Sequence, residues 1–373
     1  MAGIYIHVPF CKQACSYCNF YFSTSTRFQA DYVKALCKEI TLQKYYLKDE
    51  KVSTIYLGGG TPSLLSTDEL AIIFETLHQH FSIEKNVEIT LEANPDDLDG
   101  KKLAALSKTP VNRLSIGIQS FNDNDLKMMN RAHNAQEAMS CIPNAQDIGF
   151  DNISIDLIYG LSDMNEKDWE KNLTQAEKFK VQHLSCYSLT IEENTALFHQ
   201  IRKGKIATPK DSNSAAHFSI LMDFAKANEW RHYEISNFCK KDYISQHNSA
   251  YWKRKKYLGL GPAAHSYNQK ARQWNIANTK KYIDAVQEGK LLREEEILSP
   301  TEQMNEYIMT SLRTDWGLNL EFIQQNFADY FTQFEKHLSS IDKHLVIQKD
   351  NVITLSHNGK FYADIVASNL FVE

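Results

Sequence analysis

Three cysteines crowd into a short loop near the start of the chain, at C-x3-C-x2-C spacing: Cys11, Cys15 and Cys18. Cysteine thiolates are strong ligands for soft metals, so this loop predicts a metal centre. A structural zinc site takes four protein ligands, and His7 is the candidate for the fourth because no second cysteine pair follows. A [4Fe–4S] cluster held by three cysteines instead leaves one iron open to chelate an amine and a carboxylate. The spacing alone leaves both kinds of centre open.

Glycines and polar side chains stand at the ends of the next predicted strands. Gly58, Gly59 and Gly60 follow one strand, and a glycine run allows the backbone to approach a ligand closely. The further candidates are Thr61, Glu92, Gln119, Arg131 and Asp156. In parallel α/β folds the carboxyl ends of the strands meet at one edge. Carboxylates there suit amine or ribose hydroxyl groups, and an arginine suits a carboxylate through a bidentate contact.

The segments that must position these residues alternate between strand-like and helix-like patterns. Apolar, β-branched runs predict strands at 3–8, 53–57, 87–93, 114–118, 153–158 and 183–189. Helical periodicity lies between and after them at 27–46, 67–81, 98–106, 135–148, 165–178 and 212–228. Strict alternation implies parallel strands joined by right-handed crossovers. The predicted fold class is therefore α/β, a partial (β/α)6 TIM-like barrel, with a doubly wound open sheet as the alternative.

The pattern changes after about residue 290. Helices are predicted at 301–315, 320–327 and 330–341, a hairpin at 344–356 and a last helix at 360–370. This order resembles a small helical, winged-helix-like module. We therefore expect a barrel core over 1–225, a connecting region over 226–292 and a C-terminal module over 293–373.

Composition and charge argue against several classes of protein. The 373 residues carry 41 Lys and Arg against 46 Asp and Glu, a net charge of −5, which disfavours nucleic acid as a partner. No apolar run approaches the roughly 20 residues that span a bilayer. The first residues lack the basic-then-apolar layout of a signal peptide. We expect a cytoplasmic protein with no membrane span and no nucleic-acid partner.

The cysteine spacing followed by Gly-Gly-Gly-Thr-Pro resembles the radical S-adenosylmethionine (SAM) superfamily. Four further motifs are similar to its oxygen-independent coproporphyrinogen III oxidase group: Glu92-Ala-Asn-Pro95, Ser115-Ile-Gly-Ile-Gln-Ser-Phe121, Asn130-Arg-Ala-His133 and Asp156-Leu-Ile-Tyr-Gly-Leu161. With them, the resemblance covers nearly the whole chain.

The resemblance implies a role for each matching residue. The three cysteines would hold a [4Fe–4S] cluster, and the contacts to the SAM bound to it would be Tyr5, Gly59 and Glu92. In the oxidase a second SAM is contacted by residues that match Gly60, Thr61, Gln119, Arg131 and Asp156.

Two departures from the oxidase pattern favour a different member of the same group. Phe20 stands where the oxidase has another cysteine, and the cluster loop begins at residue 11 without the oxidase's N-terminal extension. In addition, His247, Tyr251 and Trp252 form an H-N-x-x-Y-W motif that is similar to that of haem chaperones. A neutral imidazole can ligate haem iron, and flat aromatic rings can stack on a macrocycle.

The resemblance therefore implies a haem chaperone that binds haem, covalently in this family, and delivers it to apo-haemoproteins. A homodimer is compatible with that role. The alternative is a coproporphyrinogen III oxidase that carries out oxidative decarboxylation. A DNA-binding regulator that reads DNA with the C-terminal module is the least favoured, because that region carries no basic stripe.

Overall fold

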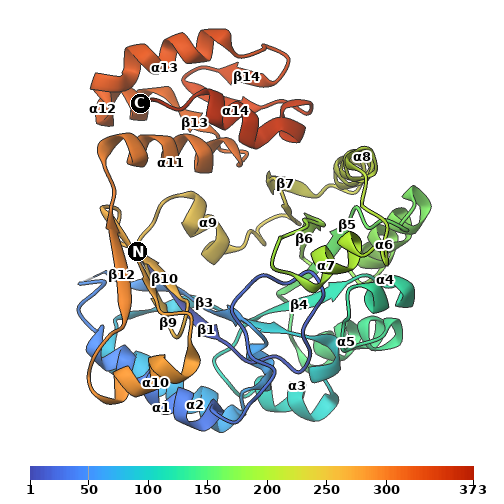
Figure 1. Ribbon diagram of the computed structural model, residues 1–373, viewed down its shortest axis with the longest axis vertical. Coiled ribbons are helices and arrows are strands. Elements are labelled where there is room, and N and C mark those ends of the chain that lie inside the picture. The colour runs from blue at the N-terminus through green and yellow to red at the C-terminus, as the bar shows by residue number, and fades with distance from the viewer. Residues whose placement is uncertain (49) are drawn as a thin grey trace.

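One curved sheet of twelve strands runs through the computed structural model, which describes residues 1–48 and 50–373 (Figure 1). Its strand order is β12-β11-β10-β9-β1-β2-β3-β4-β5-β6-β8-β7. The strands predicted from the sequence are β1 (Ala2–Val8), β2 (Val52–Gly59), β3 (Ile83–Ala93), β4 (Arg113–Gln119), β5 (Ile153–Tyr159) and β6 (His183–Ser188). They pair in parallel, each with the next. The outer strands of the sheet do not pair with each other among the described residues, so the predicted partial (β/α)6 barrel is confirmed and it is open.

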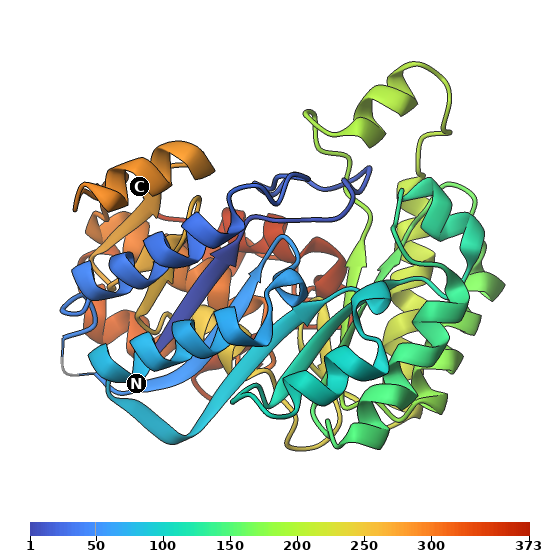
Figure 2. The same cartoon turned by 90° about the horizontal axis from the view of Figure 1, so that it is seen from below.

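Helices return the chain between these strands. Most of them lie along the outer face of the sheet, whereas α7 (Ala196–Arg202) stands away from it beyond the carboxyl ends of the strands (Figure 2). They are α1 (Gln29–Leu42), α2 (Thr67–His80), α3 (Gly100–Leu106), α4 (Asp123–Met128), α5 (Ala135–Ile148), α6 (Glu166–Lys178), α7 (Ala196–Arg202) and α8 (Asp211–Ala227). Successive side chains of β1 point to opposite faces of the sheet, so only every second one packs against these helices. Ile4, Ile6 and Val8 are fully buried in the main hydrophobic core, whereas Tyr5 and His7 project to the opposite face, the barrel interior.

Most differences from the predicted elements lie at their ends. α3 begins at Gly100, two residues after its predicted start, because the Asp99 carboxylate caps the backbone N–H of Lys102 and a 3-10 turn (Pro95–Asp97) precedes it. α2 begins at the predicted residue, because Ser66 and Glu69 form a capping box. α4 and α7 are short helices that the sequence patterns did not predict.

The region 226–292, expected only as a connection, supplies strands to both edges of the sheet. It contains β7 (Arg231–Glu234), β8 (Asn237–Cys239), α9 (Gln246–Trp252), β9 (Tyr257–Leu260), β10 (His265–Tyr267), β11 (Ala271–Asn275) and α10 (Thr279–Gln287), and β12 (Arg293–Ile297) follows. β9 pairs in parallel with β1, joining Gly3 to Tyr257 and Ile6 to Leu260. The first strand of the chain therefore becomes an interior strand.

The last part of the chain forms a module of its own at the top of Figure 1. It consists of α11 (Pro300–Leu312), β13 (Leu318–Asn319), α12 (Leu320–Asn326), α13 (Ala328–Ser340), β14 (Val346–Lys349), β15 (Val352–Leu355), a 3-10 turn (Gly359–Tyr362) and α14 (Ala363–Asn369). Its three strands form a separate sheet, and its buried side chains form a separate hydrophobic cluster around Phe334. The predicted helices and hairpin are present. Among the described residues no helix is long and apolar enough to cross a membrane.

Candidate cofactor site and the His247 motif

The loop that carries the three cysteines follows β1 and lies beyond the carboxyl ends of the strands (Figure 2). It is tied to the segment after α4, where the Ser16 backbone N–H donates to the carbonyl oxygen of Met129 at 2.9 Å. Burial raises the pKa of the Cys11 thiol to about 11, and negative charge on Cys18 or Cys15 would raise it further. The three thiols thus lie near one another in a place where thiolates need a positive centre beside them.

His7 is not placed to complete a zinc site. Its Nε2 lies 2.8 Å from the carbonyl oxygen of Tyr21, and its Nδ1 lies 3.2 Å from the hydroxyl of Tyr5. Among the described residues, no three metal-binding side chains converge on a point that a single ion could occupy. In an iron–sulfur cluster each cysteine binds a different iron, so the thiols need not converge. Of the two centres that the spacing allows, the arrangement fits the cluster.

The glycine run packs against the backbone of the cysteine loop. Gly60 N donates to the carbonyl oxygen of Val8 at 2.8 Å, and Thr61 N donates to that of Phe10 at 2.6 Å. A Cβ on Gly60 would lie 2.6 Å from the Phe10 oxygen and 2.7 Å from the Val8 oxygen. Gly59 has a φ of +102°, in the left-handed region. These glycines are therefore required by the close approach of the chain to itself, in addition to any approach to a ligand.

Replacing Gly60 by alanine is expected to push the cysteine loop off the end of β2. The new Cβ would meet backbone atoms, which cannot swing aside, so we expect a loss of about 1–3 kcal/mol in the free energy of unfolding. Urea denaturation measures that loss, and iron analysis after anaerobic reconstitution is expected to give a lower cluster content. Gly100→Ala is the control, because no atom lies within 4 Å of a Cβ there. Full iron loading and an unchanged midpoint in Gly60→Ala would contradict the packing argument.

Glu92, near the end of β3, is a partly buried carboxyl group in the barrel interior. The Tyr56 hydroxyl donates to its Oε1 at 2.7 Å, and Gly59 N donates to its Oε2 at 3.2 Å. Burial raises the pKa of Glu92 to about 7, and the nearby Asp156 adds to the rise. A carboxylate poised in this way can accept hydrogen bonds from an amine or hydroxyl group and gains charge when a cation binds.

The raised pKa of Glu92 predicts that the cofactor-free protein loses stability between about pH 4.5 and 7. In this window the unfolded chain has already released the proton that the folded protein still holds, so rising pH favours unfolding. Below pH 4.5 the carboxyl group is protonated in both the folded and the unfolded chain. The free energy of unfolding is therefore expected to fall by about 3 kcal/mol across the window. Urea unfolding at pH 5 and pH 8 measures it. Glu92→Gln is expected to reduce the dependence, with the remainder coming from Asp156, whose pKa is also raised, whereas Glu75→Gln on the exposed face of α2 leaves it unchanged. An equally steep dependence in Glu92→Gln would exclude Glu92 as its source.

Asp156 on β5 shares the barrel interior with an arginine that the sequence analysis did not single out. Burial raises the pKa of Asp156 to about 6, opposed by the Ser185 hydroxyl and by the charges of Arg113 and Arg131. Arg113 opens β4 and is only 1% exposed. Its Nη1 lies 3.5 Å from Thr90 Oγ1, and its Nε has no hydrogen-bond partner among the described residues. An arginine at the start of an otherwise apolar strand was the signal available in the sequence.

Arg131 reaches the cysteine loop from the segment after α4. Its Nη1 donates to Cys15 Sγ at 3.2 Å, and its Nη2 donates to Asn94 Oδ1 at 2.5 Å and to the carbonyl oxygen of Gly117 at 2.9 Å. Gln119, two residues beyond Gly117, has a φ of +63°, which residues other than glycine rarely adopt. The structure therefore gathers the predicted strand-end residues at the edge that carries the cysteines, and their roles as ligand contacts stay predictions.

The H-N-x-x-Y-W motif lies on α9, which packs against β1 and β2. The Glu88 carboxylate accepts hydrogen bonds from the backbone N–H groups of Gln246 and His247 at 3.1 and 2.9 Å. The His247 ring enters the barrel, where its Nδ1 lies 2.8 Å from Thr54 Oγ1 and its Nε2 lies 2.8 Å from the Tyr251 hydroxyl. Burial lowers the pKa of His247 to about 3, so the ring is neutral.

The Tyr56 side chain lies between the His247 ring and the Glu92 carboxylate and contacts both. Its hydroxyl binds Glu92, and its ring stacks on that of His247 with centroids 5.0 Å apart and planes at 25°. Tyr5 stacks on the same two rings, 6.2 Å from Tyr56 and 6.5 Å from His247. The predicted SAM contact Glu92 and the predicted haem ligand His247 are thus separated by the Tyr56 ring, whereas Tyr5, also a predicted SAM contact, stacks on His247 directly.

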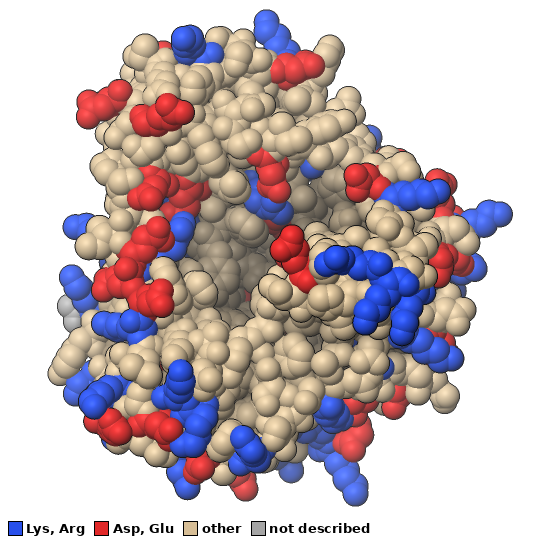
Figure 3. Space-filling view, in the orientation of Figure 1, with Lys and Arg blue, Asp and Glu red and all other residues tan. Residues whose placement is uncertain are grey.

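Trp252 ends α9 and faces away from His247. The Arg313 guanidinium, at the end of α11, lies 5.4 Å from the centroid of its ring. The motif therefore divides between two environments, with His247 and Tyr251 in the barrel and Trp252 beside the C-terminal module. The face of the molecule in Figure 3 is hollowed at its centre, between that module and the barrel, and most atoms that line the hollow belong to uncharged residues.

Residues 5–176 match the Radical SAM superfamily. Over 376 aligned residues the chain is 34% identical to the heme chaperone HemW of Bacillus subtilis (strain 168), with 98% of each protein covered. The chain belongs to the HemW family. A second HemW, from Lactococcus lactis subsp. lactis (strain IL1403), is 33% identical and covers 92% of this chain and 89% of its own. A mitochondrial relative of Bos taurus, radical S-adenosyl methionine domain-containing protein 1, is 31% identical over 96% of this chain and 83% of its own.

The fold of this HemW-family chain matches that of a solved structure, coproporphyrinogen III oxidase (HemN) from Escherichia coli. The TM-score is 0.86 at 23% identity, over 100% of this chain and 90% of the other. This likeness supports the radical SAM fold, including the C-terminal module. Membership of the superfamily implies a [4Fe–4S] cluster and SAM, and the residues fit both: grouped thiols that need a positive neighbour, and a carboxylate poised to take up charge.

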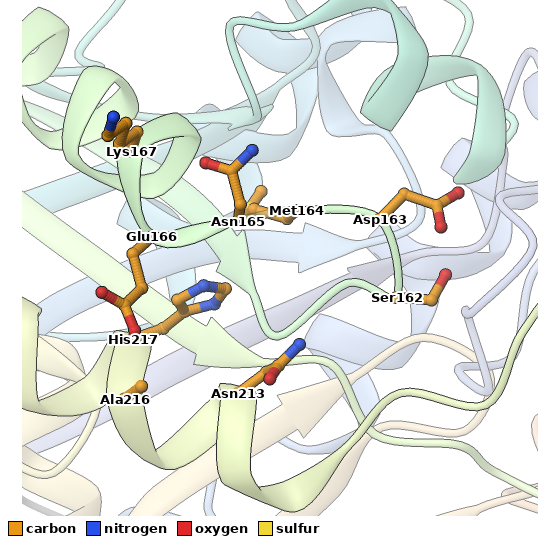
Figure 4. A pocket seen from close by; sticks show the side chains of 9 residues that line it. All are labelled: Ser162, Asp163, Met164, Asn165, Glu166, Lys167, Asn213, Ala216 and His217. Atoms are coloured by element: carbon orange, nitrogen blue, oxygen red, sulfur yellow. The ribbon is translucent and has the colours of Figure 1, made fainter.

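A separate hollow of about 540 Å³ opens at the end of β5, and none of the predicted site residues lines it. Figure 4 shows His217 of α8 beside Glu166, with Ser162 on the far side. His217 Nδ1 accepts the backbone N–H of Gly160 at 3.1 Å, so the neutral ring carries its proton on Nε2. No spacing in the sequence predicts that these residues lie together.

Proposed function

We propose that this chain is a haem chaperone that binds haem and delivers it to apo-haemoproteins. The observation that carries the proposal is the similarity to a heme chaperone over 98% of both proteins. The H-N-x-x-Y-W motif at 247–252 supports it, since a neutral histidine beside aromatic rings suits a ferric macrocycle. The expectations of a cytoplasmic location and of a homodimer stay predictions.

In this proposal the radical SAM core holds its cofactors with the residues at the carboxyl ends of the strands. Cys11, Cys15 and Cys18 ligate the cluster, and the bound SAM is contacted by Tyr5, Gly59 and Glu92. Further polar contacts, to the same or a second SAM, come from Gly60, Thr61, Gln119, Arg131 and Asp156. When bound, the cluster and SAM supply one-electron chemistry. The chain's own part is to orient them, with Glu92 held by Tyr56 and Gly59 and Arg131 held by Asn94.

Haem ligation by His247 is part of the proposal and requires a local rearrangement. Thr54 occupies Nδ1 and Tyr251 occupies Nε2, so iron would take the place of the Tyr251 hydroxyl at Nε2. The depressed pKa of His247 favours the neutral ring that ligation requires. Tyr251 would then contribute an aromatic contact to the macrocycle. Trp252, the other predicted contact of the motif, faces the C-terminal module and would reach this macrocycle only after a further rearrangement.

Two parallel assays of the anaerobically reconstituted chain test the proposed function. Titration with haem is expected to give a saturable Soret band. Incubation with coproporphyrinogen III, SAM and a reductant is expected to give no protoporphyrinogen, in keeping with Phe20 at the position of the oxidase's additional cysteine. Formation of protoporphyrinogen at a useful rate would reject the chaperone function and support the oxidase function instead. Absence of saturable haem binding would also reject the chaperone.

A further inference from the structure

A cavity of about 480 Å³ is lined by residues of α9, of β10 and its following turn, and of the C-terminal module. Its aromatic walls are Trp252, Tyr267, Tyr307, Trp316, Phe322 and Phe327. They come from the end of α9, from β10, from α11 and α12, and from the turn before β13. Only Trp252 belongs to the motif read from the sequence. Tertiary folding brings the others to it from β10 and from the C-terminal module.

Two polar side chains in these walls are buried without the hydrogen bonds they could form. Tyr267 is 3% exposed, and its hydroxyl, which lies beside the Arg254 side chain, makes no hydrogen bond of good geometry among the described residues. Arg254 is partly buried, its Nε likewise lacks a partner there, and the closest carboxylate oxygen, on Glu306, lies 4.0 Å away. A buried donor without a partner costs free energy that a ligand's acceptor atom can recover.

A second cation stands at the mouth of the cavity. Lys253 is exposed, and its Nζ lies 4.7 Å from the centroid of the Trp316 ring. Aromatic walls on several sides suit a flat, apolar ring system. Lys253 and Arg254 suit carboxylates at the edge of that ring system, because charge-assisted hydrogen bonds to carboxylates are strong. The cavity volume is within the range of small-molecule sites.

We infer that this cavity binds the ring of a porphyrin, with its propionates on Lys253 and Arg254. The inference rests on the proposed function and adds a second binding position to it. Because iron lies at the centre of the ring, a porphyrin in this cavity is not the one whose iron His247 would ligate. The separation follows from the position of His247, whose two ring nitrogens are bonded inside the barrel while the cavity lies beyond Trp252. Binding at the two positions can therefore be measured independently.

Metal-free protoporphyrin IX is the probe, because it has the ring and the propionates but no iron to ligate. Added to the full chain with its cluster reconstituted, it is expected to quench tryptophan fluorescence to saturation. Trp316→Leu is expected to weaken its binding about tenfold. Lys253→Gln is expected to weaken the free acid about fivefold and to leave the dimethyl ester unchanged, since the ester has no carboxylate. Lys253 is exposed, so this variant is expected to fold normally.

Two matched variants control for the loss of any tryptophan or any lysine. Trp274→Leu removes a β11 side chain that stacks on His265 at 5.8 Å and does not line the cavity, and Lys255→Gln removes a neighbouring charge. Both are expected to bind the free acid like the unmodified chain. Equal affinity in Trp316→Leu, Lys253→Gln and these controls would overturn the cavity assignment.

The outcomes also separate this inference from the proposed function. If haem binds and its Soret band depends on His247, but metal-free protoporphyrin does not bind, the cavity assignment fails and the chaperone stands. If metal-free protoporphyrin binds with the expected dependence on Trp316 and Lys253, the cavity is supported whatever ligand the iron takes. If neither haem nor protoporphyrin binds, both proposals fail.

Discussion

Cys15→Ser is expected to abolish the iron–sulfur cluster. A serine hydroxyl is a hard oxygen ligand and replaces a soft thiolate poorly, and the remaining two cysteines leave a four-iron cluster half supported. Iron after anaerobic reconstitution is expected to fall from about four atoms per chain to near zero, together with the visible charge-transfer absorbance. Arg131 Nη1 also loses the sulfur to which it donates at 3.2 Å, so the loop loses a contact at the centre of the site.

The matched control for this variant is Cys37→Ser. Cys37 is also a partly buried free cysteine, but it lies on α1 and belongs to the packing around the core. The Cys37→Ser variant is expected to bind as much iron after reconstitution as the unmodified chain. Because Cys15 lies in a loop at the surface end of the barrel, Cys15→Ser is expected to change the unfolding free energy of the cofactor-free chain by only about 0.5 kcal/mol. An intact cluster in Cys15→Ser would reject the ligand assignment.

His247→Ala is expected to have two large effects, one on haem and one on the fold. The buried ring fills space between Tyr56 and Tyr251, and its removal leaves the Tyr251 hydroxyl and Thr54 Oγ1 without their partner. A loss of about 2–4 kcal/mol in unfolding free energy is expected. The Soret band of added haem is expected to shift or weaken. Because Tyr5 and Tyr56 stack on His247, SAM affinity is expected to fall as well.

Tyr251→Phe separates ligation from support of the fold. It keeps the imidazole and removes the hydroxyl that occupies its Nε2. If His247 ligates haem iron, this variant is expected to bind haem at least as tightly as the unmodified chain, because Nε2 is already free. Difference absorption spectra with ferric haem measure both variants. A folded His247→Ala chain with an unchanged Soret band would remove His247 as a ligand.

The parallel core could be predicted from the sequence because its signals are local. Buried strands such as Ile153–Tyr159 are short segments rich in isoleucine and leucine, and Ser66 with Glu69 marks the start of a helix within four residues. The contribution of β9 could not be predicted in this way. β9 is only four residues long and includes a glycine, so its own sequence is a weak strand signal. It forms a strand because it pairs with the free edge of β1, which lies more than 250 residues earlier in the chain.

The candidate site also combines features that local sequence predicts with features that depend on distant parts of the chain. The cysteine spacing and the strand-end polar residues were readable, since each is defined by its neighbours in sequence. Arg113 was missed because its importance comes from burial among groups on other strands. The motif at 247–252 is continuous in sequence, but its side chains lie on different faces of α9. His247 and Tyr251 are four residues apart and share one face, whereas Trp252 lies on another.

The sequence by itself determined the family and the partial (β/α)6 barrel and predicted the cluster loop, because these depend on residue types at short spacings. Only the tertiary structure decided what surrounds them. It placed Gly60 against the backbone of Val8 and Phe10, layered Tyr56 between Glu92 and His247, and joined Trp252 to Trp316 in one cavity. Those neighbours are set by the packing of segments far apart in the chain, where burial of apolar surface and satisfaction of polar groups select one arrangement.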